Sequence, residues 1–146
     1  METDGVYAPE TVDAAQAAYD SLGSTAQIVV TETAKAMELG PDAYNERVTG
    51  AVIETARDAL FASLLEVHHG DREAFEAWCD DHPDYSIEIF GGDDADAIVW
   101  HPAPFAETVI AATYQNEPEA AAATARRRAF GEQYRPAFEA TDDEMG

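Results

Sequence analysis

Apolar residues recur every three or four positions over most of the chain, which predicts a mainly helical protein. A first helix is expected over about 9–23, where Pro9 suits its start and Gly23 its end. The longest stripe predicts a central helix over about 43–67, and its positions are Val48, Val52, Ala56, Leu60 and Leu64. An apolar arc this broad needs neighbours on more than one side.

The period changes to two between residues 85 and 101, which indicates β-structure. Tyr85, Ile87 and Ile89 alternate with polar residues, 97–101 is a second β-like run, and a Gly-Gly-Asp-Asp turn lies between them. This pattern predicts one β-hairpin over about 85–101. Further helices are expected over about 24–39, 71–81, 105–115 and 118–135, the last ended by Pro136.

Together these elements predict a mainly α fold, α+β by strict count. We expect a single-domain bundle of five to six helices around the central helix, with the hairpin inserted. The domain spans residues 1–140, and residues 141–146 form a flexible acidic tail.

The chain is strongly acidic: it has 30 acidic and eight basic residues, which give a net charge of −22 on 146 residues. Lys35 is the single lysine. Salt of about 1 M shortens the screening length from about 10 Å to about 3 Å and removes most of the repulsion. A content of 46% hydrophobic and 10% aromatic residues argues against disorder. We therefore expect a folded, halophilic protein with an acidic surface and a coat of counterions.

Three segments carry a resemblance to a known family: Val30–Met37 (VTETAKAM), Ala56–Leu65 (ARDALFASLL) and Trp100–Thr113 (WHPAPFAETVIAAT). With the acidic composition, they resemble a small haloarchaeal family of unknown function over about Ala8 to Tyr134. The resemblance implies archaeal, halophilic provenance and one domain. It implies no activity and carries over no functional residues.

The sequence also bears on cellular location. Cys79 is the single cysteine, so no intrachain disulfide forms, which favours a reducing compartment. The N-terminus lacks the charged and apolar regions of a signal peptide, and no apolar stretch approaches about 18 residues. We expect a cytoplasmic protein with no membrane association.

Two partial metal motifs are present. Glu66 and His69 have E-x-x-H spacing, but no second such pair completes a di-iron set, and a solvated helix end is the favoured interpretation. Cys79 and His82 form half of a zinc pattern, while the other histidines stand at no recognisable spacing. The favoured interpretation of Cys79 is a buried residue beside Phe75 and Trp78. We predict no metal and no cofactor.

Arg126, Arg127 and Arg128 form the one basic cluster. Such a cluster could dock phosphate, RNA or an acidic partner. The favoured interpretation is a helix C-terminus whose cations pair with Glu132 and neighbouring carboxylates. Molar salt would also weaken phosphate attraction, which argues against a nucleic-acid partner.

A second group of candidates consists of Trp100, His101, Glu54 and Arg57. They would line a pocket between the hairpin and the central helix, although core packing of Trp100 against that helix is the favoured interpretation. No Walker loop, G-x-G-x-x-G, G-x-S-x-G or H-E-x-x-H motif occurs, and no catalytic residue is assigned.

The leading hypothesis is therefore a non-catalytic interaction or accessory domain that self-associates or binds a protein partner. A small enzyme or ligand-binding protein using the pocket is the first alternative. An RNA- or phosphate-associated protein using the arginine cluster is the second.

Overall fold

The computed structural model describes residues 2–145, with side chains described through residue 140. The chain divides into two compact units. The sheet unit comprises Met1–Ala15 and Ala62–Gly146, and the helical unit comprises Gln16–Phe61. The predicted helical bundle with one hairpin is wrong, because the fold is α+β and contains a five-stranded mixed sheet. The predicted tail at 141–146 falls where side chains are not described and stays a prediction.

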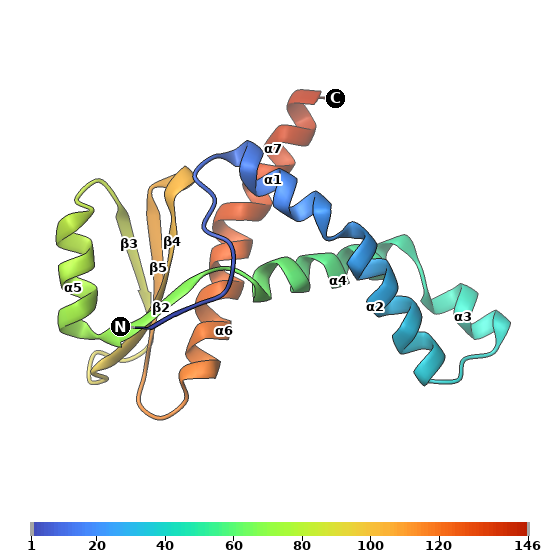
Figure 1. The fold of residues 1–146 in the computed structure, drawn as a ribbon, viewed down its shortest axis with the longest axis horizontal. Helices are drawn as coiled ribbons and strands as arrows, with labels where there is room; N and C mark the ends of the chain where they lie inside the picture. The colour runs from blue at the N-terminus through green and yellow to red at the C-terminus, as the bar shows by residue number, and fades with distance from the viewer. Residues whose placement is uncertain (1, 146) are drawn as a thin grey trace. The chain divides into compact units, whose positions relative to one another are not determined.

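The sheet unit is built on the strand order β1-β2-β4-β5-β3 (Figure 1). Strand β3 runs parallel to β5, and the other neighbours are antiparallel. The strands are β1 Glu2–Asp4, β2 Val67–Asp71, β3 Ser86–Phe90, β4 Ala97–Ala103 and β5 Thr108–Tyr114. The helices are α5 Arg72–Asp81, α6 Pro118–Ala129 and α7 Arg135–Met145, with a 3-10 turn at Pro104–Ala106 and a π-helical segment at Phe130–Tyr134.

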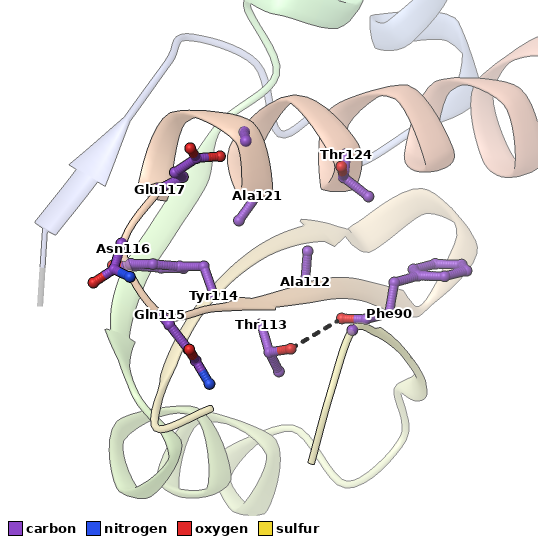
Figure 2. Close-up of a pocket in the computed structure, with 11 residues that line it drawn as sticks. Phe90, Ala112, Thr113, Tyr114, Gln115, Asn116, Glu117, Ala121 and Thr124 are labelled. Carbon is purple, nitrogen blue, oxygen red and sulfur yellow. Dashed lines mark hydrogen bonds between the residues drawn. The ribbon is translucent and has the colours of Figure 1, made fainter. Parts of the chain in front are cut away.

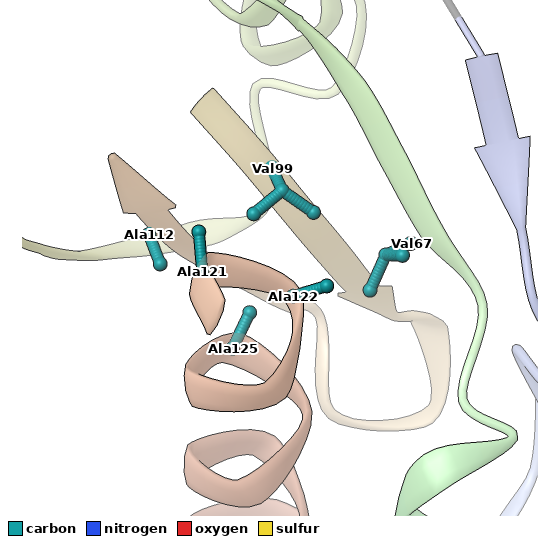
Figure 3. Packing of buried hydrophobic residues seen from close by; sticks show 6 residues of the cluster. All are labelled: Val67, Val99, Ala112, Ala121, Ala122 and Ala125. Carbon is teal, nitrogen blue, oxygen red and sulfur yellow. The ribbon is translucent and has the colours of Figure 1, made fainter. Parts of the chain in front are cut away.

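Helices α5 and α6 pack on opposite faces of this sheet. On the α6 side, three alanines of the helix lie against apolar side chains of three strands (Figure 3). Their small side chains let the helix approach the sheet closely, so this layer is thin. The packed residues are Val67, Val99, Ala112, Ala121, Ala122 and Ala125. On the α5 side, Phe75 packs against Ile98, Trp100, Val109 and Ala111.

The predicted hairpin over 85–101 is wrong although both of its strands exist. Strand β5 lies between β3 and β4 and pairs with each of them. The predicted helix over 105–115 is this strand. Its residues Thr108–Ala112 are buried, so the strand shows no apolar–polar alternation. A step of four from Phe105 to Val109 therefore resembled a helical period.

The predicted central helix over 43–67 is also wrong. It divides into α3 (Pro41–Arg47) and α4 (Gly50–Ser63), and residues 67–71 form β2. Thr49 accounts for the break, because its hydroxyl accepts a hydrogen bond from the Val52 N–H at 3.3 Å and begins a new helix. The apolar stripe from Val48 to Leu64 begins before this break, so its regular spacing predicted one continuous helix.

Pro136 does not end the last helical run as predicted. The chain continues into α7, and the π-helical segment precedes the proline. The Arg135 N–H bonds to the Phe130 carbonyl, five residues back. A proline has no N–H for the usual bond to residue i−4, and the wider π turn accommodates that loss.

The helical unit contains α2 (Gly23–Ala36), α3 and α4, and α1 (Val12–Ser21) crosses into it. Tyr19 meets Phe61 edge-to-face at 5.7 Å between ring centroids, and its hydroxyl donates to Asp58. Burial, and next the Asp58 carboxylate, raise the pKa of Tyr19 to about 12. These contacts join α1 to α4.

Candidate functional site

His101 is fully buried on β4 and uses both ring nitrogens. Its Nδ1 lies 2.6 Å from the Glu66 carbonyl oxygen, and its Nε2 lies 2.7 Å from the Tyr134 hydroxyl. A carbonyl oxygen only accepts, so Nδ1 carries the proton and the tyrosine donates to Nε2. Burial lowers the pKa of His101 to about 4 and raises that of Tyr134. The neutral imidazole therefore connects β4 to the residue that precedes β2 and to the π-helical segment.

Trp100 is also fully buried, on the opposite face of β4. Its ring meets Phe75 of α5 at 5.3 Å and stacks on His68 at 5.7 Å between centroids. Core packing was the favoured interpretation and is correct, but the partner is α5 rather than a central helix. Cys79 and Trp78 pack against the same cluster as Phe75, but Cys79 is half-buried rather than buried as predicted.

Glu54 and Arg57 belong to α4 of the helical unit. Glu54 is exposed, whereas the Arg57 guanidinium lies 4.1 Å from the centroid of the Tyr19 ring. Four pockets in the described chain are lined by neither of these residues, nor by Trp100 or His101. These pockets therefore give no geometric support to the predicted site.

The three consecutive arginines have three different environments. Arg126 donates from Nε to the Leu65 carbonyl at 2.8 Å, while Arg128 lies 4.8 Å from the centroid of the Phe90 ring. Arg127 is exposed. Within the described residues, no carboxylate lies at ion-pair distance from any of the three, so the expected pair with Glu132 is absent there. The cluster does not form one cationic face.

Side chains of the two partial metal motifs contact neighbouring residues of the chain. Glu66 precedes β2, and its carboxylate lies 3.6 Å from Nε2 of His68. His82 contacts the Trp78 carbonyl through Nδ1 at 2.7 Å. Burial, then the nearby carboxylates Asp80 and Glu76, raise the pKa of the Cys79 thiol. Such a thiol is a weak nucleophile at neutral pH. Among the described residues, no group of three potential ligands is placed to hold a metal ion.

A pocket of about 440 Å³ in the sheet unit lies where β5 leads into α6 and β3 ends (Figure 2). Phe90 and Tyr114 supply rings, and the Thr113 hydroxyl donates to the Gly92 carbonyl at 3.1 Å. Glu117 is the one carboxylate in this lining, so the lining holds no carboxylate pair for acid–base catalysis. The shape suits binding, and its chemistry favours no particular ligand.

An apolar pocket of about 200 Å³ lies on the helical unit. Four large side chains of this unit are strongly exposed, among them Met37 at 56% and Val52 at 43%. We call the surface the α2–α4 patch; its apolar members are Val29, Val30, Met37, Leu39, Val48 and Val52. Sequence reasoning did not locate this surface, because it placed Val48 and Val52 on the stripe of the predicted central helix. The signal was available in the Ile28–Val30 run, which is more apolar than one buried helix face requires.

Comparison with known proteins places the chain without assigning an activity. No curated protein and no solved structure matches it. None of the helices in residues 2–145 has the length and apolar character needed to cross a membrane. A family model described as "Family of unknown function (DUF5809)" matches residues 6–135, and the chain therefore belongs to this family.

Proposed function

We propose that the protein is an interaction domain that self-associates through the α2–α4 patch. The observation that carries the proposal is this exposed apolar pocket on a chain of net charge −22. Exposed apolar clusters on a soluble protein mark interaction surfaces. Of the nine residues that line the pocket, Arg47 is the one charged residue.

A second copy of the chain fits the charges around the patch. The lining holds a cation and no carboxylate, whereas the exposed carboxylates Glu38 and Glu46 stand next to lining residues in sequence. In a two-fold arrangement, Arg47 of each copy would approach the acidic rim of the other while the apolar centres meet. Arginine beside an apolar centre is typical of protein interfaces.

We also propose that the protein works in a cytoplasm that contains molar salt. Its support is the net charge of −22 and the single, half-buried free thiol of Cys79. Between two such copies, repulsion opposes association in dilute buffer and is screened by salt. Thermal melts in about 0.1 M and 2 M KCl test whether the protein is adapted to high salt. A Tm that rises by several degrees is expected, and an unchanged Tm would contradict this part.

Sedimentation velocity in about 2 M KCl tests self-association. Val52→Asp should weaken the dimer at least about 30-fold, because a carboxylate would enter the apolar centre of the interface. Val6→Asp is the matched control: it makes the same charge change at a valine that is 64% exposed outside the helical unit. It should leave the association unchanged.

Two results would refute the proposal. One is a wild-type chain that stays monomeric at all concentrations in 2 M KCl. The other is a dimer that Val52→Asp and Val6→Asp weaken equally, since a general charge effect would then explain the loss.

A further inference from the structure

Among the residues that the structure describes, strand β3 lies at the edge of the sheet and pairs with β5 alone. The Ser86 N–H donates to the Glu107 carbonyl at 2.8 Å, toward β5. Backbone groups alternate in direction along a strand, so those of Glu88 also point toward β5. Those of Ile87 and Ile89 point away from the sheet. Two residues therefore offer unpaired donors and acceptors along an open edge.

The side chains of the same two residues form one wall of a groove whose lining also includes the charged residues Arg72, Glu76 and Asp80 of α5. Ile87 is 50% and Ile89 46% exposed on the α5 side of the sheet. Together with Phe75 and Cys79 of α5 they line a pocket of about 290 Å³. An added strand would direct every second side chain into this groove.

The opposite side of β3 carries a carboxyl pair. Glu88 lies beside Glu132 of the π-helical segment, and its Oε2 is shielded from solvent. A shared hydrogen bond with Glu132, and next burial, raise the pKa of Glu88. Two adjacent carboxyl groups that resist joint ionisation favour a cation beside them.

A second copy of β3 fits this edge poorly. Antiparallel pairing that uses the outward groups of Ile87 and Ile89 would centre on Glu88 and place it opposite its own copy. Like charges directly opposite each other destabilise a strand pair. Glu88 therefore disfavours self-pairing and favours a partner strand with a basic residue at that position.

We propose that β3 binds an extended segment of a protein partner as an additional strand of the sheet. The segment carries apolar residues that enter the groove beside α5, alternating with lysine or arginine beside Glu88 and Glu132. This mode is β-augmentation, in which backbone bonds give affinity and alternate side chains give specificity. It uses the sheet unit and is independent of the α2–α4 patch.

The probe is a fluorescent peptide, Ser-Val-Lys-Val-Lys-Val-Ser, titrated into the full chain by anisotropy. NMR hydrogen exchange reports the contact: the amides of Ile87 and Ile89 should gain protection, and that of Glu88 should not change. N-methylating alternate peptide amides should abolish binding to the wild-type chain. Ile87→Thr with Ile89→Thr should weaken binding about tenfold. Val6→Thr, at an exposed valine outside the groove, should leave binding unchanged.

A second experiment tests the role of charge, with the variant Glu88→Lys and a peptide that has glutamate in place of lysine. The original peptide should bind this variant at least about fivefold more weakly, and the glutamate peptide should bind it more tightly than it binds the wild type. Four results would overturn the proposal: no saturable binding up to about 1 mM peptide, binding without protection at Ile87 and Ile89, equal binding of the N-methylated peptide, or concentration-dependent protection of these amides without peptide.

Discussion

The buried His101 should make the stability of the sheet unit depend on pH. The native state holds its imidazole neutral, with a pKa lowered by burial from 6.5 to about 4. The unfolded chain takes up a proton near pH 6.5. The free energy of unfolding therefore falls as the pH drops below about 6.5, and the loss is complete below about 4. The lowered pKa corresponds to about 3 kcal/mol over this whole range.

A substitution isolates this contribution. His101→Gln keeps one donor and one acceptor near the Glu66 carbonyl and Tyr134 hydroxyl but cannot titrate. At pH 7 we expect the variant to be about 1–3 kcal/mol less stable, because hydrogen bonds to buried groups are imperfectly replaced. Between pH 7 and pH 5 the difference between wild type and variant should shrink by about 2 kcal/mol.

Urea unfolding followed by tryptophan fluorescence measures this difference. Carboxyl groups and the other histidines titrate in both proteins and cancel in the comparison. Measurements should stop near pH 5, above the pI of about 4.1, where the net charge vanishes. A difference that stays constant within about 0.5 kcal/mol from pH 7 to pH 5 would refute the assignment of a neutral, buried imidazole.

Three further substitutions test the packing by urea unfolding. Gly5→Ala should cost about 2 kcal/mol or more, because Gly5 has φ +96° and a Cβ there would lie 2.4 Å from the Leu65 carbonyl oxygen; Gly40→Ala, with open space around it, is the control, and equal losses would contradict the argument. Trp100→Ala should cost about 3–5 kcal/mol through the cavity it leaves, and a loss below about 1 kcal/mol would contradict full burial. Asp71→Ala should cost about 1 kcal/mol, since its carboxylate caps α5, and an unchanged midpoint would count against the cap.

Local signals on the sequence located several elements well. Asp71 caps α5 at the start of the range 71–81 predicted for this helix, and Pro118 begins α6. Helix α1 lies inside the predicted range 9–23, and α2 begins at Gly23, one residue before the predicted range 24–39. In each case the determinant is a residue acting on its own turn, which is the kind of information a single sequence contains.

The sheet was missed because its determinants are not local. Strand β5 is buried on both faces, and β4 contains Pro102, which normally argues against an interior strand. Pro102 is tolerated because it lies beyond the last residue pair between β4 and β2. The insertion of β5 between two strands that precede it in the chain leaves no trace in periodicity.

The candidate residues show the same limit. His101 meets a carbonyl 35 residues away and a hydroxyl 33 residues away, so its role depends on tertiary contacts. Trp100 and His101 are adjacent in sequence yet face opposite sides of β4. Consecutive residues of a strand always separate in this way, so they could not share one pocket wall.

Intermolecular paramagnetic relaxation most directly tests the central claim, self-association through the α2–α4 patch. A ¹⁵N-labelled wild-type chain is mixed in 2 M KCl with an unlabelled chain carrying Glu32→Cys with a spin label, in a Cys79→Ser background. The account predicts broadening of the Val29 and Val52 amides of the labelled copy. Broadening that is absent, or confined to β3, would contradict it.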